Sequence, residues 1–515
     1  MDNVGVLHSF RRRLRRSFWK ALREALWPVT RAELKKVLSL FILLFLLCTC
    51  YSILRNLKDT TILNAEGSGA EILPFIKVWG VLPGAVLGTW LYTTLCNWCT
   101  REKACYILLT GFVAYFLLFA FFLYPNKDFF YLSSFHTWAG TFLPAGMNGF
   151  VAMVSNWMFT IFYVICELWS VLILTVVFWG FANDVTEIAE AKRVYGFFNI
   201  GSNLAPIVGG YLALYVTDLA PIPLLPHGID AWGETLNKMV PVIALLALSS
   251  MGLFYWINRR VLPNNPAQQV AKVVLNKKKK LSITQSLLLI SRSKYLLALS
   301  AIVIGFSIAI NMTDVLWKSQ LKLLFPDPCM MNNHMNKITI GIGTIGTIGG
   351  LLFFAMIRRF GWSFVALLTP MAMTLMGIGF FTFLFTGSHL AGFASLFGAT
   401  PLMLTVYFGS MQNCLSKAGK YSVFDATKEM AFLPLDAETR IQGKAAIDGL
   451  GSGMGKSGAS LIYQFFLITA GSVAYSMPYI AVLLAVVFVL WIASVLYVGR
   501  GFKKMTETTP TPVSI

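Results

Sequence analysis

Long apolar runs divide this chain into segments that are each long enough to cross a lipid bilayer. The hydrocarbon core of a bilayer is about 30 Å thick and needs about 20 residues of helix. Segments near residues 72, 197, 389 and 446 also carry Gly, Pro, Ser or Lys, which is typical of helices that line a polar interior. The pattern predicts twelve membrane-spanning helices, near residues 38–57, 72–95, 104–124, 157–182, 197–217, 239–258, 295–316, 338–357, 362–386, 389–411, 446–470 and 477–499.

The composition agrees with this pattern and excludes a soluble globular protein. Hydrophobic residues make up 57% of the 515 residues and charged residues only 13%, which leaves too little polar surface to cover a water-exposed fold. The eight cysteines fall mostly in or beside apolar runs, without the spacing of a secreted disulfide framework. Cys96 and Cys99 have redox-motif spacing, but they end a hydrophobic helix with no βαβ unit around it, so we interpret them as structural.

Lysine and arginine residues between the spans predict the orientation, because cytoplasmic loops carry an excess of them. Both termini are predicted to be cytoplasmic, which requires an even number of spans. We attribute most of the net charge of +19 to this topology and expect no nucleic-acid partner. The basic residues gather in the amino-terminal flank, the even-numbered loops and the carboxyl tail, at residues 11–16, 101–103, 192–193, 277–280, 358–359, 417–444 and 500–504.

A basic linker divides the spans into two groups of six. Arg193-Val-Tyr-Gly-Phe-Phe-Asn-Ile200 aligns weakly with Arg440-Ile-Gln-Gly-Lys-Ala-Ala-Ile447, at an offset of 247 residues. Joined to the count of spans, this similarity favours a major-facilitator-like architecture of two parallel repeats with a substrate site near mid-membrane. The predicted units are a basic amphipathic lead at 1–35, expected to form an interfacial helix, an amino-terminal half at 36–258, a cytoplasmic linker at 259–294, a carboxyl-terminal half at 295–500 and a cytoplasmic tail at 501–515.

We single out four charged residues inside the predicted spans, because a charge at the bilayer centre costs about 2.5 to 3.5 kcal/mol. Lys77 lies early in the second span and Glu167 in the middle of the fourth. Asp314 lies near the outer end of the seventh span and Lys456 within the eleventh. Each also has a plainer explanation: Lys77 could extend to the interface, Glu167 could form a structural ion pair with a lysine, and Asp314 could be interfacial. Lys456 is deep only if its span begins near residue 444.

These charges indicate an anion site if they face one water-filled cavity. The two lysines, together with Arg55 and Lys58 at the end of the first span, would suit a ligand with several phosphate oxygens, because ammonium and guanidinium groups bind them through charge-assisted hydrogen bonds. The two acids would neutralise the lysines in the empty site or bind a coupling proton. The glycine-rich run at 341–350 has only helix packing as its explanation.

The stretch at 449–458 is rich in glycine and contains Gly455-Lys456-Ser457, as an ATP-binding P-loop would. A P-loop also needs glycine five residues before the Gly-Lys pair, and this chain has Leu450 there. A long apolar run follows in place of a soluble helix. We therefore expect neither an ATPase nor another enzyme, and no cofactor or metal site.

Five motifs of this chain are shared with a known family: Leu54-Arg-Asn-Leu-Lys-Asp-Thr60, Gly67-Ser-Gly-Ala-Glu-Ile-Leu-Pro-Phe-Ile-Lys-Val-Trp79, Cys166-Glu-Leu-Trp169, Phe178-Trp-Gly-Phe-Ala-Asn183 and Gly455-Lys-Ser-Gly458. By these motifs the chain resembles the nucleotide transporters of obligate intracellular bacteria and plastids, the ATP/ADP translocase family, over residues 28 to 500. The resemblance implies a twelve-span, major-facilitator-like fold, alternating access and four critical charges in the order lysine, glutamate, glutamate, lysine. By motif these fall on Lys77, Glu167, Asp314 and Lys456, so the third position has the shorter acid.

The resemblance implies a secondary transporter that imports ATP in exchange for ADP, with nucleotides as its partners. We expect a monomeric, multi-pass protein of a bacterial inner membrane. Two alternatives stay open on the sequence: a proton-coupled importer of nucleoside triphosphates, and an exchanger of broader nucleotide specificity. The preferred nucleobase is also open, as is the effect of aspartate at position 314.

Overall fold

The computed structural model describes residues 33–219, 230–262, 290–291 and 293–508. Within these residues the regular elements are helices, without a β-strand. Nine helices in this part of the chain are long and apolar enough to cross a membrane. The predicted all-helical, multi-span fold is therefore confirmed, whereas the count of twelve spans stays a prediction.

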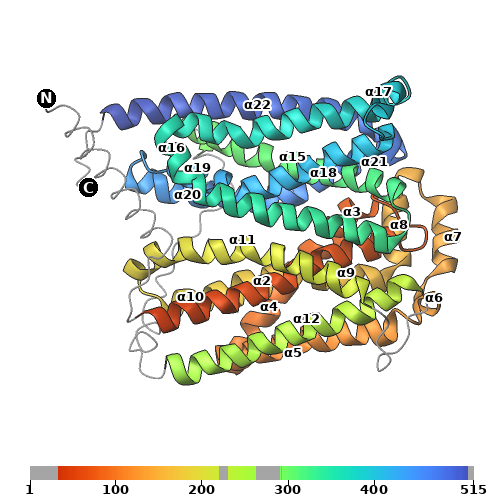
Figure 1. Cartoon of the computed structure of the whole chain (residues 1–515), viewed down its shortest axis with the longest axis horizontal. Coiled ribbons are helices and arrows are strands. Elements are labelled where there is room, and N and C mark those ends of the chain that lie inside the picture. Colours follow the sequence, from red (N-terminus) through yellow and green to blue (C-terminus); the bar gives the residue numbers. More distant parts are fainter. Residues whose placement is uncertain (1–32, 220–229, 263–289, 292, 509–515) are drawn as a thin grey trace, which may run out of the picture.

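The amino-terminal half forms the lower group of helices in Figure 1, coloured red to yellow-green. Short π-helical turns interrupt several of its long helices; such turns are frequent at functional sites. Its elements are α2 (Leu34–Leu63), α3 (Ile72–Phe75), η1 (Ile76–Val81), α4 (Leu82–Trp98), α5 (Arg101–Leu118), η2 (Phe119–Leu123), α6 (Lys127–Phe130), α7 (Ser133–Phe142), η3 (Ala145–Met147), α8 (Asn148–Ser155), α9 (Trp157–Leu168), η4 (Trp169–Phe178), α10 (Trp179–Val185), α11 (Ile188–Asp218), α12 (Ala231–Trp256) and η5 (Ile257–Val261).

The carboxyl-terminal half forms the upper group, coloured green to blue (Figure 1). Its longest element, α16 (Pro328–Thr386), turns at Gly361, whose φ of 79° is a left-handed conformation that favours glycine. This element therefore consists of two arms. The others are α15 (Lys294–Leu324), α17 (Ala391–Ser395), α18 (Pro401–Gly419), η6 (Lys420–Phe424), α19 (Asp425–Ala431), α20 (Ala437–Gly453), η7 (Met454–Gly458), α21 (Ala459–Ala470) and α22 (Val473–Thr508).

The bounds predicted for the span at 389–411 are wrong. The long helix begins only at Pro401, where the Thr400 side chain accepts a hydrogen bond from an amide of the first turn. It then continues through η6 and α19 to Ala431. Polar residues inside this helix, Lys417 among them, lower its hydropathy, so the apolar run ended before the helix does.

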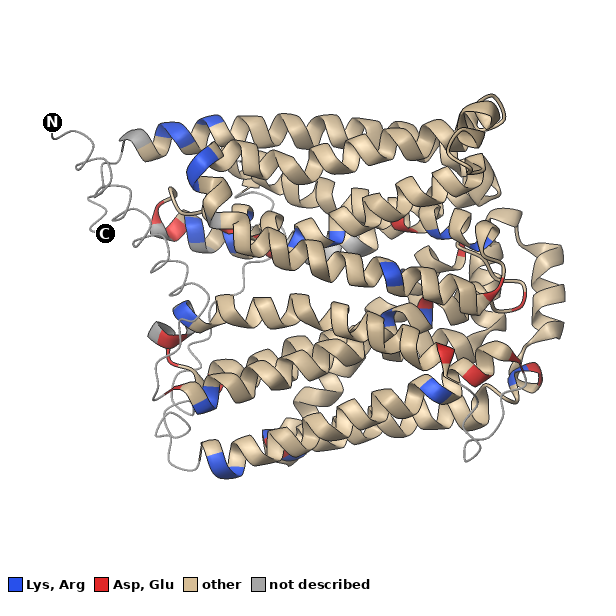
Figure 2. Cartoon of the chain, viewed as in Figure 1, with Lys and Arg blue, Asp and Glu red and all other residues tan. Residues whose placement is uncertain are grey.

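Both described ends of the chain lie at one end of the molecule, on the left in Figure 1. We call this the inner end and the opposite one the outer end. Figure 2 shows lysine and arginine at the inner ends of several helices and also in the middle and outer parts of the molecule. The cytoplasmic orientation of the termini stays a prediction. The lead at 1–35 lies outside the described residues except for residues 33–35, as does most of the linker at 259–294. Residues 501–508 continue α22, and the rest of the predicted tail at 501–515 lies outside the described residues.

Hydrogen bonds join the two halves in their outer part. Lys322 of α15 donates bonds of 2.6 Å to the carbonyl oxygens of Leu63, the last residue of α2, and of Ser68 in the turn that follows. Asn56 of α2 donates a bond of 2.7 Å to Asn336 of α16. These partners lie toward the outer ends of their helices, so the contacts hold the halves together on that side.

Glycines bring α11 and α16 close together across the boundary between the halves. A Cβ added at Gly343 would lie 2.6 Å from Cγ1 of Ile207 and 2.7 Å from the carbonyl oxygen of Asn203. On the opposing surface, a Cβ added at Gly210 would lie 2.6 Å from Cγ1 of Ile340. The glycine-rich run at 341–350 therefore acts in helix packing, because small residues let two backbones approach closely.

Gly343→Ala is expected to destabilise the protein by about 1 to 3 kcal/mol, because an extra methyl group in a filled contact forces its neighbours apart. The matched control is Gly350→Ala in the same run, since a Cβ at Gly350 would meet nothing within 4 Å. Thermal melting of the detergent-solubilised variants measures the difference. Equal melting temperatures for the two variants would contradict the close approach of α11 and α16.

The outer end also holds a cavity of about 400 Å³, lined by the ends of α2, α9, α12 and α16. Lys127 and Asp230 form an ion pair on its wall. Asp230 also caps α12 by accepting a hydrogen bond of 2.7 Å from the Gly233 amide. Burial raises the pKa of Asp230, but hydrogen bonds from the Lys127 ammonium and the Gly233 amide outweigh this effect and hold the pKa below its usual value.

The Lys127–Asp230 ion pair is expected to stabilise the protein less as the pH falls. A carboxyl group whose pKa is lowered by folding stabilises the protein above its unfolded pKa of about 3.9, and the contribution is lost as the pH falls through the folded value. Asp230→Asn keeps the cap and should cost about 0 to 1 kcal/mol at neutral pH, as for other partly exposed pairs. Melting temperatures across a pH series measure this effect. A difference between variant and wild type that persists in acid would argue against it.

Candidate functional site: a row of buried charges between the two halves

Three charged residues share one face in the outer third of α2. Lys58 and Asp59 follow Arg55 by three and four residues, which places both one turn after it on the helix. Arg55 is half-buried and donates a hydrogen bond of 3.3 Å to Oγ1 of Thr339 in α16. Lys58 and Asp59 are only 2% and 3% exposed, and Nζ of Lys58 lies 2.9 Å from Oδ1 of Asp59.

Glu167 approaches this face from α9. Its Oε1 lies 2.9 Å from Nζ of Lys58, and the same ammonium lies 3.8 Å from the ring centroid of Tyr163, one turn earlier on α9. The turn that follows α9 is held against α2, where Nε1 of Trp169 donates a bond of 3.1 Å to the Leu47 carbonyl oxygen. The alternative of an ion pair between Glu167 and a lysine is therefore realised, and the lysine is Lys58.

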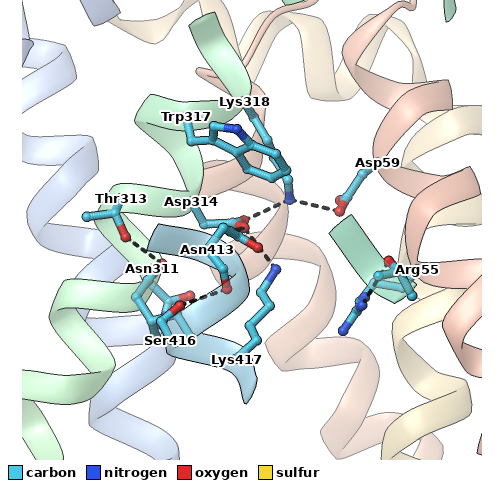
Figure 3. Close-up of polar contacts among 12 residues, drawn as sticks. Arg55, Asp59, Asn311, Thr313, Asp314, Trp317, Lys318, Asn413, Ser416 and Lys417 are labelled. Atoms are coloured by element: carbon cyan, nitrogen blue, oxygen red, sulfur yellow. Dashed lines mark hydrogen bonds and ion pairs between the residues drawn. The ribbon is translucent and has the colours of Figure 1, made fainter. Parts of the chain in front are cut away.

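α15 carries the corresponding face in the second half. Nζ of Lys318 lies 2.7 Å from Oδ2 of Asp314, one turn earlier on the same helix. Lys318 also reaches across to α2, where its Nζ lies 2.8 Å from Oδ2 of Asp59 (Figure 3). The interfacial position considered for Asp314 is wrong, because α15 continues to Leu324 and the Asp314 side chain is only 9% exposed.

Two residues of α18 complete the surroundings of Asp314. Nζ of Lys417 lies 3.1 Å from Oδ1 of Asp314, and Nδ2 of Asn413 donates a bond of 2.8 Å to the same oxygen. α18 is held against α15 by Nε1 of Trp317, which donates a bond of 3.0 Å to Oγ of Ser410. Figure 3 shows the Asp314 carboxylate between the ammonium groups of Lys318 and Lys417.

Lys77 reaches the same region from the first half. It lies in η1 and is half-buried, and its Nζ donates a bond of 3.2 Å to Oδ1 of Asn311 in α15. Asn311 lies one turn before Asp314 on the same helix. Lys77 is therefore directed toward the α15 face that carries Asp314.

Lys456 lies in η7, but its side chain is outside the described part of the structure. The neighbouring Gly455 packs on α15, where an added Cβ would lie 2.6 Å from the side chain of Ser307. The Ser307 carbonyl oxygen in turn accepts a bond of 2.8 Å from Nδ2 of Asn311. The backbone at Lys456 thus lies close to the residues around Asn311, and the role of its side chain stays a prediction.

Six of these side chains form a line of alternating charge that crosses from one half to the other. Its four middle members are buried, whereas the side chains at its two ends are 21% and 22% exposed. The two ends are therefore the most exposed members of the line. We call this line the charge row; its successive charged atoms are 2.7 to 3.1 Å apart, and in order its members are Glu167, Lys58, Asp59, Lys318, Asp314 and Lys417.

Sequence reasoning missed three members of the charge row. Asp59 directly follows Lys58, and Lys318 stands four residues after Asp314, so helical spacing was the available signal for both. Lys417 was counted with the basic loop at 417–444, and the structure corrects this: Lys417 lies inside α18.

Comparison with known proteins relates the chain to one family over most of its length. The family model described as TLC ATP/ADP transporter matches residues 13–502. ADP,ATP carrier protein 1 of Chlamydia muridarum is 40% identical over 487 residues, which cover 93% of this chain and 91% of that protein. The plastidic ATP/ADP-transporter of Solanum tuberosum is 37% identical over 475 residues, which cover 92% of this chain and 74% of that protein. Among solved structures, a D-xylose-proton symporter matches with a TM-score of 0.49 and 15% identity, over 92% of this chain and 98% of the symporter.

Proposed function

Because this chain belongs to the TLC ATP/ADP transporter family, we propose that it exchanges ATP for ADP across a membrane by alternating access, with the polyphosphate bound beside the charge row. The protein is a multi-pass membrane transporter and not an enzyme. A site between two helical halves is consistent with alternating access, in which one half moves against the other around the bound ligand.

The proposal rests on a surplus of positive charge beside the charge row, where some of the basic side chains are only half-buried. The charge row has three acidic and three basic members, so it is neutral as a whole. Arg55 and Lys77 beside it add two positive charges. Lys77 and Lys417 are both half-buried, so their ammonium groups can meet a ligand. A polyphosphate matches this surplus and forms strong charge-assisted hydrogen bonds with such groups.

The pairing inside the charge row favours exchange over proton-coupled import. Each of its three carboxylates has an ammonium group within 3.1 Å. The carboxylates of the charge row are therefore balanced by lysines without bound protons. Swapping ATP⁴⁻ for ADP³⁻ moves one net charge across the membrane, which a potential of about 100 mV biases by about 2.3 kcal/mol.

The hydrogen bonds at the outer end support a conformation that releases nucleotide toward the inner end. We place the inner end in the cytoplasm and propose that ATP moves inward and ADP outward. We assign the carrier to the inner membrane of a bacterium, as a monomer. We also assign Lys456 to the phosphate site, because its motif matches the family and η7 packs on α15.

The test is uptake of radiolabelled ATP into vesicles that contain the purified protein. Vesicles loaded with ADP should accumulate ATP, empty vesicles should not, and a protonophore should leave the uptake unchanged. Uptake into empty vesicles that a protonophore abolishes would support proton coupling instead. Counterflow across a panel of labelled nucleotides then defines the range of bases and phosphate lengths.

A further inference from the structure

We propose that the ion pair between Asp59 and Lys318, the outer ion pair, couples nucleotide binding to the opening of the outer end and so makes exchange obligatory. This inference rests on the proposed exchange function. The pair joins α2 of the first half to α15 of the second at 2.8 Å, and both side chains are less than 5% exposed. Lys318 is thus a positioning residue that acts through Asp314 without touching the nucleotide.

The outer ion pair can break without leaving a buried charge unpaired. Asp59 keeps Lys58 as a partner at 2.9 Å, and Lys318 keeps Asp314 at 2.7 Å. Breaking a buried ion pair is strongly unfavourable when one charge is left uncompensated. Here each half retains its own partners, so the cost of separation is confined to one contact. The pair is therefore suited to open and close repeatedly.

Asp314 links the outer ion pair to the reachable end of the charge row. Its two oxygens bind different lysines, Oδ2 binding Lys318 and Oδ1 binding Lys417. The Lys417 side chain is 22% exposed and the Lys318 side chain 3%. A phosphate group can therefore engage Lys417 while Lys318 stays buried.

Phosphate binding at Lys417 should weaken the outer ion pair by a direct electrostatic route. Once Lys417 turns to the phosphate, Asp314 is left with Lys318 and the amide of Asn413. The added negative charge on this side also attracts Lys318, so Lys318 is drawn away from Asp59. Without nucleotide the pair stays closed and the outer end does not open. A ligand shifts a conformational equilibrium only through such a difference in interaction between two states.

The test replaces the outer ion pair and measures transport without a counter-substrate. Asp59→Asn removes the pair but leaves Lys58 with Glu167 and Lys318 with Asp314. Vesicles preloaded with labelled ADP and placed in nucleotide-free medium should lose ADP at least about fivefold faster than wild type, the lower end of usual coupling effects. Asp59→Glu keeps a carboxylate and should restore dependence on external nucleotide.

The matched control is Asp230→Asn, which removes an ion pair at the outer end within the first half only. This variant should exchange nucleotide and retain ADP as the wild type does. Strict dependence on external nucleotide in Asp59→Asn would overturn the inference while leaving the proposed function intact. Wild-type vesicles that do not exchange ATP for ADP would overturn the proposed function itself.

Cys329 provides a second readout in the unaltered protein. It lies at the outer end of α16, with its Sγ 3.5 Å from Oγ1 of Thr235 in the first half. Four of the other cysteines are buried, Cys48 lies in the middle of α2, and Cys96 and Cys99 lie at the inner end of α4. Labelling of Cys329 by a membrane-impermeant maleimide from outside should accelerate severalfold when ATP is added, and Cys329→Ser identifies the signal. A labelling rate that ATP does not change, in protein that exchanges nucleotides, would overturn the inference even if Asp59→Asn did not accumulate.

Discussion

Lys417→Gln is expected to reduce ATP/ADP exchange by about 10- to 100-fold, while the protein accumulates in the membrane at its normal level. Hydrogen bonds to charged groups contribute about 1.5 to 3 kcal/mol each, and about 1.4 kcal/mol corresponds to a tenfold change. Folding should be spared, because Asp314 keeps Lys318 at 2.7 Å and the amide of Asn413 at 2.8 Å. Initial rates of ATP uptake into ADP-loaded vesicles, with KM and maximal rate determined separately, measure the effect.

Two further variants distinguish an effect of losing the Lys417 charge from a general effect of changing this region of the chain. Lys420→Gln removes a lysine that lies over the ring of Tyr421 at 5.0 Å, outside the charge row, and should leave exchange unchanged. Lys417→Arg keeps the positive charge and should retain part of the activity. Wild-type exchange by Lys417→Gln would show that the half-buried end of the charge row does not bind phosphate.

Asp314→Asn is expected to destabilise the protein by about 3 to 5 kcal/mol and to abolish exchange. The carboxylate lies between two ammonium groups, at 2.7 Å from Lys318 and 3.1 Å from Lys417. Its loss leaves the buried charge row with a surplus of lysine, and a buried charge without its partner is destabilising by about that amount. Thermal melting in detergent and the quantity of protein in the membrane measure the first effect. Vesicle uptake measures the second.

Asp314→Glu is the matched control for this prediction. It keeps the carboxylate and introduces the residue type that the family resemblance implies at this position. The variant should melt close to the wild type and retain exchange, since the longer side chain can still face both lysines. If Asp314→Asn melted and transported as the wild type does, the assignment of Asp314 as the central acid of the charge row would be wrong.

The fold was predictable because long apolar runs dominate the sequence, and in a bilayer each run is stable as a helix, whose backbone groups are hydrogen-bonded within the segment. The ends of the helices were less predictable where helices carry polar residues. α18 continues through Lys417, and α15 continues through Lys318 to Leu324. In both helices polar residues, a lysine among them, ended the apolar run, yet the helix continued because its partner at this point is protein and not lipid.

The site was predictable only where a charge stood deep in an apolar run, as Glu167 does. Pairings across the halves leave no local signal: Asp59 and Lys318 are 259 residues apart in the sequence. Lys58 was predicted as a ligand for phosphate, and in the structure it is 2% exposed and paired with two carboxylates. Spacing indicates which face of a helix is polar, but the partner of that face follows from tertiary packing.

A side chain of each helix fills the space beside a glycine of the other: Ile207 of α11 lies against Gly343, and Ile340 of α16 lies against Gly210. None of these four residues belongs to the charge row. The contact that joins the halves here and the charges proposed to bind the ligand are thus made by different residues, so substitutions in the charge row can alter the choice of ligand while this contact is kept.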